Sequence, residues 1–199
     1  MTEKPTSYEQ FSLPSAQEIL GLTLDERTNW TKELSPVEPS QRLIEDLEDN
    51  VLLALATNTE KARSELVITP ILNELRRRKG VTVFSGKTFN VDDDLGLKGR
   101  CDFIVTASDE LYYIKAPVLT IIEAKNESIV SGLGQCLATM VAAQIFNQSE
   151  EVFGAVTTGD RWKFLRLANK VASIAPVEYS LDSLGKILGL LDFATRSIA

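Results

Sequence analysis

Hydrophobic positions recur along this chain at two spacings, one helical and one extended. Leu, Ile and Val recurring every three or four positions predict a helix that begins at Ser40 and a second over 59–79 that ends at Gly80. Pro70 should kink the second helix or start a new turn, with Thr69 as its cap. The middle of the chain therefore opens with two helices.

Extended segments rich in β-branched residues follow these helices. A hairpin across Gly86 should join 81–85 to 88–91. The run 118–125 is almost continuously apolar, as in a central strand buried on both faces. Further strands are predicted over 100–106, 111–114, 152–157, 161–167 and 171–175, and further helices over 128–147 and 181–197. This order predicts an α/β fold with a mixed β-sheet flanked by helices.

The first part of the chain differs in composition from the rest. Residues 1–40 are rich in Pro, Ser, Thr and Glu and predict an acidic N-terminal arm with one short element near 15–22, followed by one domain over 41–199. Residues 1–60 hold 12 acidic and 4 basic side chains, whereas 61–199 hold 16 and 17. The net charge of −7 therefore belongs to the first part, and a neutral body is compatible with phosphate binding without requiring it.

Residue usage excludes several chemistries. The chain has no histidine and only two cysteines, Cys101 and Cys136, so Ser-His and Cys-His nucleophile pairs are impossible and structural zinc is not expected. We expect both thiols to be reduced. The sequence predicts no membrane-spanning helix and no signal peptide, so a cytoplasmic protein with no membrane partner is expected. Carboxylates, lysine and a hard metal ion remain for catalysis.

Four polar residues occupy positions where the local pattern favours apolar ones. Glu65 falls on the apolar stripe of the second helix, and a carboxylate there is costly unless something pairs with it. Asp102 interrupts an apolar strand. Glu123 ends the apolar run, and Lys125, two residues later, projects to the same face. These residues are candidates for one site.

Magnesium chemistry accounts for this set. Mg²⁺ prefers oxygen ligands, which Asp102, Glu123 and the backbone carbonyl of Ala124 would provide on adjacent strands. A metal-acidified water would attack phosphorus, and Lys125 would position that water or stabilise charge on the phosphate. Glu65 would accept a metal-bound water or hold a second ion.

The spacing of these residues resembles the PD-(D/E)XK nuclease superfamily, which has a restriction endonuclease-like core. Asp102 is followed after twenty residues by Glu123-Ala124-Lys125, each in a strand context typical of that superfamily. A helix Glu before these strands and a helix Gln after them complete the pattern, here Glu65 and Gln135. The resemblance covers about 58–167 and lacks one element, since Cys101 stands where the superfamily name has proline.

The resemblance implies a nuclease that hydrolyses phosphodiester bonds of DNA with Mg²⁺ or Mn²⁺, with Gln135 orienting Lys125 or a water. Specificity would come from a protein partner or a homodimer. One alternative is a catalytically silent module with the same fold that binds nucleic acid or a protein partner in a defence or repair system. Another is a magnesium-dependent phosphoryl reaction on a small nucleotide, although the chain has no P-loop.

Ordinary structural roles compete with each assignment. Glu123 and Lys125 would also fit a solvated strand end with a salt bridge. Asp102 would also fit a buried carboxylate that accepts from backbone amides or from Arg100. Gln135 is common on helices of every kind. The arrangement of these residues in space decides between the two interpretations.

Overall fold

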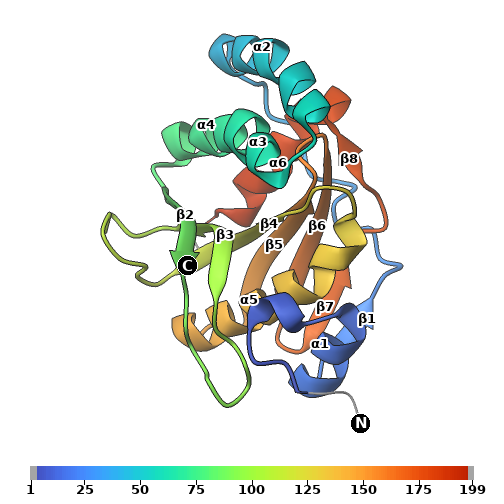
Figure 1. Cartoon of the computed structure of the whole chain (residues 1–199), viewed down its shortest axis with the longest axis vertical. Coiled ribbons are helices and arrows are strands. Elements are labelled where there is room, and N and C mark those ends of the chain that lie inside the picture. Colours follow the sequence, from blue (N-terminus) through green and yellow to red (C-terminus); the bar gives the residue numbers. More distant parts are fainter. Residues whose placement is uncertain (1–3, 197–199) are drawn as a thin grey trace.

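The computed structural model describes residues 4–196 and has an open, mixed β-sheet with helices on both faces (Figure 1). Within that range the sheet has eight strands in the order β1-β7-β6-β5-β4-β3-β2, and β8 pairs with β6. The strands are β1 (Thr23–Asp25), β2 (Thr82–Thr88), β3 (Arg100–Thr106), β4 (Val118–Ala124), β5 (Glu151–Thr157), β6 (Arg161–Ala168), β7 (Val171–Ile174) and β8 (Tyr179–Ser180). The predicted α/β class with a mixed, helix-flanked sheet is confirmed.

The centre of the sheet is the parallel pair of β4 and β5. Parallel neighbours need a crossover connection, and α5 (Ile129–Asn147) supplies it. Every residue of β4 is buried, as its apolar run predicts. On one side β3 and β2 add antiparallel strands, and on the other β6 and β7 do the same, with β1 parallel to β7 at that edge.

The helices form two layers, which lie above and below the sheet in Figure 1. Below it lie α1 (Leu13–Leu20) and α5; above it lie α2 (Gln41–Thr57), α3 (Glu60–Arg63), α4 (Thr69–Lys79) and α6 (Leu184–Ala194). Three short elements complete the set: η1 (Tyr8–Gln10), the π-helix η2 (Ser64–Ile68) and η3 (Leu181–Ser183). A separate hydrophobic core lies between the sheet and each helix layer. Successive residues of β4 point into the two cores in turn: Ile121 faces α5 and Ile122 faces the other layer.

Helix α5 is the most buried helix among the described residues. By length and composition alone it could cross a membrane. However, 72% of its apolar window is buried inside the fold, which is typical of a core helix. Its small residues permit this burial, since a Cβ added at Gly134 would lie 2.4 Å from the carbonyl oxygen of Phe11.

The predicted N-terminal arm is folded onto the body in the part that the structure describes. Tyr8 and Phe11 are buried in the core beneath α5, and the Tyr8 hydroxyl donates to the carbonyl of Leu97 at 3.1 Å. The single element expected near 15–22 is α1, and β1 adds an edge strand after it. Residues 4–40 thus contribute three elements, η1, α1 and β1, to the same fold as the rest of the chain.

Several local predictions are wrong. β2 continues through Gly86 and pairs along its length with β3, so the hairpin of 81–85 with 88–91 does not form. Residues 111–114 lie in a loop, because no neighbouring strand is available to them. Thr69 lies inside continuous helix and is not a cap. The last helix ends at Ala194, and part of the predicted 181–197 lies outside the described residues.

The two cysteines behave as predicted. Cys101 on β3 and Cys136 on α5 are free and buried. Burial raises the pKa of both thiols, so they are poor nucleophiles at neutral pH.

Candidate active site

Asp102 and Glu123 meet where β3 and β4 separate. The ladder between these strands pairs Phe103 with Ile122 and stops there. One residue beyond, Asp102 Oδ2 accepts a hydrogen bond from the backbone N–H of Ala124 at 2.8 Å. The side chain of Asp102 thus replaces a backbone partner at the point where the strands diverge.

The backbone of Ala124 is turned toward this opening. The next residue, Lys125, donates its backbone N–H to the Thr157 carbonyl on the opposite side, with an N···O distance of 2.8 Å. Because successive residues of a strand direct their polar groups to opposite edges, the carbonyl of Ala124 faces β3, as its N–H does. This oxygen is therefore on the Asp102 side of the strand.

A chain of hydrogen bonds joins Glu123 to Lys125 through α5. Gln135 Nε2 donates to Glu123 Oε2 at 2.7 Å, and Lys125 Nζ donates to Gln135 Oε1 at 3.0 Å. Gln135 can make both contacts because Gly132, one turn earlier, leaves room for the lysine: a Cβ there would lie 3.1 Å from Lys125 Cε. The structure thus brings together four residues that the sequence predicted, among them Asp102.

Glu123 is completely buried and only partly satisfied. When Glu123 is ionised, its Oε1 atom has no hydrogen-bond donor in the described chain. Burial raises the pKa of Glu123 well above its ordinary value. The negative charge of Asp102 and a hydrogen bond of the protonated Glu123 carboxyl to Asp102 raise the pKa further, while Lys125 opposes the shift. A buried polar oxygen without a partner is rare in folded proteins and usually indicates a site for an unseen group.

Glu65 does not lie where its sequence position suggested. Its side chain is 64% exposed and forms a 3.9 Å ion pair with Lys61, so it is not on a buried stripe. The reason is the π-helix Ser64–Ile68, whose wider turn shifts the phase that a regular helix would have. Glu65 lines a surface hollow that Asp102 also lines.

Glu60 is a helix carboxylate that interacts electrostatically with Asp102 and Lys125 of the predicted cluster, and the sequence prediction did not include it. Burial raises the pKa of Glu60, Lys125 opposes that effect, and Asp102 and Glu9 add to it, so the four groups share one electrostatic environment. The Thr59 cap, which accepts from the Ala62 N–H at 3.1 Å, fixes the start of α3 and so fixes Glu60. A signal existed in Thr59-Glu60, a cap followed by a first-turn acid.

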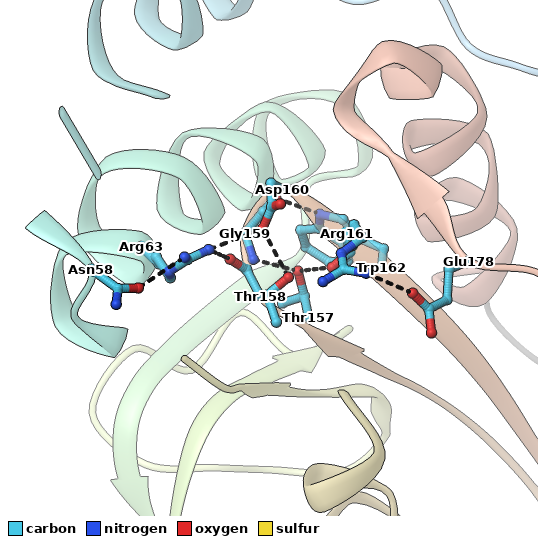
Figure 2. A network of polar contacts seen from close by, with 9 residues as sticks. All are labelled: Asn58, Arg63, Thr157, Thr158, Gly159, Asp160, Arg161, Trp162 and Glu178. Atoms are coloured by element: carbon cyan, nitrogen blue, oxygen red, sulfur yellow. Dashed lines mark hydrogen bonds and ion pairs between the residues drawn. The ribbon is translucent and has the colours of Figure 1, made fainter. Parts of the chain in front are cut away.

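Arg63 fastens α3 to the turn between β5 and β6 (Figure 2). Its guanidinium donates to the Thr158 carbonyl at 2.7 Å and to Asp160 Oδ1 at 2.9 Å, and it reaches back to Asn58 Oδ1 at 3.2 Å. The Arg63 side chain is only 11% exposed. Since β5 lies beside β4, this network holds Glu60, one turn earlier on α3, over the cluster.

Most of these groups line one open hollow of about 390 Å³, whereas Glu123 has no exposed surface and is not among the lining residues. The walls of the hollow come from the N-terminal segment, α3, β3, the end of β4 and α5. Its charged and polar lining residues include Glu9, Glu60, Arg100, Asp102, Lys125 and Gln135. Within residues 4–196, no group of three or more His, Cys, Asp or Glu side chains is arranged to hold a metal, so any ion here would rely on fewer carboxylates, the backbone and water.

Comparison with protein-family models, curated proteins and solved structures finds no match to this chain.

Proposed function

We propose that this protein is a metal-dependent nuclease of the PD-(D/E)XK type that hydrolyses phosphodiester bonds of DNA. The observation that supports it most is the buried, unpartnered Oε1 of Glu123 beside the charge of Asp102. A purely structural carboxylate at that depth should have all its oxygens satisfied. Lys125 and Gln135, both part of the superfamily pattern, are hydrogen-bonded to each other.

The donor set fits a hard divalent cation. Asp102 lines the hollow, whereas Glu123 Oε1 is buried behind it and the Ala124 carbonyl faces the Asp102 side of its strand. Glu60, which also lines the hollow, takes the helix position first assigned to Glu65. Mg²⁺ retains water readily and needs few protein ligands, so two carboxylates and a carbonyl are sufficient. When bound, Mg²⁺ or Mn²⁺ would supply an acidified water and would neutralise charge on the phosphate.

The chain's own residues would prepare the phosphate for attack. Gln135 holds the Lys125 ammonium beside the hollow, where its remaining N–H groups can donate to phosphate oxygens. The same amide keeps Glu123 Oε2 occupied and so leaves Oε1 as the available oxygen. Gln135 is thus a positioning residue that sets the orientation of both charged groups.

A catalytically silent module remains the second candidate. Lys125, Gln135 and Glu123 already hydrogen-bond one another and so need no ion to satisfy most of their polar groups. Glu9 from the acidic N-terminal segment lines the same hollow and could occupy it in place of a substrate. Such a module would bind nucleic acid or a protein partner through this fold and would not turn over substrate.

Cleavage of DNA distinguishes these two functions. The purified chain should degrade end-labelled DNA, single- or double-stranded, in Mg²⁺ or Mn²⁺ and not in EDTA. Lys125→Ala should lower the rate by about a hundredfold, the size expected when one charge-stabilising donor is lost. The exposed Glu48→Ala on α2 serves as the control and should keep wild-type activity. Equal activity of wild type and Lys125→Ala would show that cleavage has another source.

A further inference from the structure

The active-site hollow is one end of a longer groove. It shares Glu60, Arg100 and Asp102 with a second hollow of about 380 Å³ between α3 and the strands β2 and β3. That hollow shares Ser85 and Phe103 with a third, of about 320 Å³, between α4 and β2. The groove therefore runs from Lys125 along β2 to the loop that joins β3 and β4.

Two arginines line this groove without an ion-pair partner. Arg76 on α4 and Arg100 on β3 are both exposed, and neither makes a salt bridge within residues 4–196. The Arg100 guanidinium lies over Gly86, where an added Cβ would be 2.5 Å from Nη2, so the glycine leaves space for it. Unpaired guanidinium groups spaced along a groove suit phosphate oxygens, which they bind in pairs.

The loop between β3 and β4, which borders the far end of the groove through Leu111, carries exposed apolar and aromatic side chains. The side chains of Leu111, Tyr112 and Tyr113 are 71%, 87% and 53% exposed. Leu111 lines the third hollow, and Lys87 Nζ donates to the Tyr112 carbonyl at 3.0 Å, which attaches the loop to β2. In Figure 1 this loop projects at the left of the view, beside β2 and away from both helix layers. No core packing accounts for the exposed rings.

Charge and aromatic exposure together indicate which form of nucleic acid fits. Affinity for a duplex depends largely on many phosphate contacts, and this chain has a net charge of −7, with Glu60 and Glu65 also bordering the groove. Unpaired bases gain affinity by stacking on aromatic rings, an interaction that depends little on net charge. Exposed tyrosines with few cations thus favour an unpaired strand over a duplex.

We propose that the groove binds an unpaired polynucleotide strand, with phosphates on Arg100 and Arg76 and bases stacked on Tyr112 and Tyr113. The strand would then lead along β2 to Asp102 and Glu123. The use of this strand as a substrate rests on the proposed nuclease function, whereas its binding does not.

Binding can be measured in EDTA, where cleavage is absent. Fluorescence anisotropy would compare a labelled oligothymidylate of about 20 nucleotides, long enough for one binding site, with a duplex of equal length. The single strand should bind at least about tenfold more tightly. Tyr112→Ala and Arg76→Ala should each weaken it by about tenfold, the equivalent of roughly 1.4 kcal/mol, and Tyr112→Phe should retain it because the ring is kept.

Arg27→Ala is the matched control, because Arg27 is exposed and follows β1 at the opposite edge of the sheet. Equal or tighter duplex binding, no binding of the oligonucleotide, or unchanged affinity in Tyr112→Ala would each overturn the proposal. If strand binding depends on Tyr112 but no Mg²⁺-dependent cleavage occurs, the nuclease function is refuted and the proposal that the groove binds a single strand still holds. If the protein cleaves DNA but Tyr112→Ala binds the strand as tightly as wild type, the proposed strand-binding role of the groove is refuted and the nuclease function still holds.

Discussion

Glu123→Gln is expected to abolish DNA cleavage, by about a thousandfold or more, while leaving the protein at least as stable as wild type. The large loss follows because the substitution removes a charged oxygen at the point where the proposed ion binds. Stability should not fall, since Gln keeps an acceptor for Gln135 Nε2 and removes a buried carboxyl that lies beside Asp102. Relief of the unsatisfied buried group is worth about 1–3 kcal/mol.

This pair of opposite effects is diagnostic of a functional group retained at a cost to stability. Urea unfolding in EDTA gives the free energy of unfolding, and the labelled-DNA assay gives the rate. Glu48→Gln, an exposed change on α2, should alter neither value. A Glu123→Gln protein that is several kcal/mol less stable than wild type would instead assign Glu123 a structural role.

Glu74→Gln is expected to lower the free energy of unfolding by about 2 kcal/mol at pH 7. Burial alone would raise the pKa of Glu74, but hydrogen bonds from Arg78, Ser40 and Arg77 outweigh it and lower the pKa to about 2. Only 4% of this side chain is exposed, and it joins α4 to the start of α2. The full shift would predict a larger loss, but both arginines are about one third exposed and water screens their charge.

The pH dependence of this effect has a definite sign. A carboxyl whose pKa is lowered on folding stabilises the protein above its unfolded pKa, near 4.5, and that contribution is lost as the pH falls toward 2. The difference between wild type and Glu74→Gln should therefore be largest at pH 7 and should fall to less than about half of that value at pH 3. Urea unfolding at both values measures it, with Glu45→Gln on the exposed side of α2 as control. A difference that stays constant over this range would contradict the ion-pair account.

The strands and the main helix of the site follow from sequence periodicity alone. The predicted range 100–106 matches β3, and 118–125 and 128–147 match β4 and α5 within one residue at each end. These elements are long, buried and uniform in pattern, which makes them the most predictable. Because Asp102 and Glu123 lie on two of them, their meeting could be foreseen.

The parts that escaped prediction depend on contacts or on irregular backbone. The π-helix turned Glu65 outward and left Glu60 facing the cluster, a change of phase that no apolar pattern encodes. Segment 111–114 has strand-like residues but no partner strand, so it stays an exposed loop. The burial of Tyr8 against the β2–β3 loop depends on tertiary contacts from distant residues.

Binding of Mg²⁺ to the metal-free protein tests the central claim most directly, because it does not depend on the substrate. Isothermal titration calorimetry with MgCl₂, repeated with MnCl₂, should show heat of binding for wild type and for the exposed variant Glu48→Gln. It should show none for Asp102→Asn or Glu123→Gln. Absence of any metal binding to wild type, or unchanged binding in Glu123→Gln, would contradict a metal site between Asp102 and Glu123 and would favour the silent module.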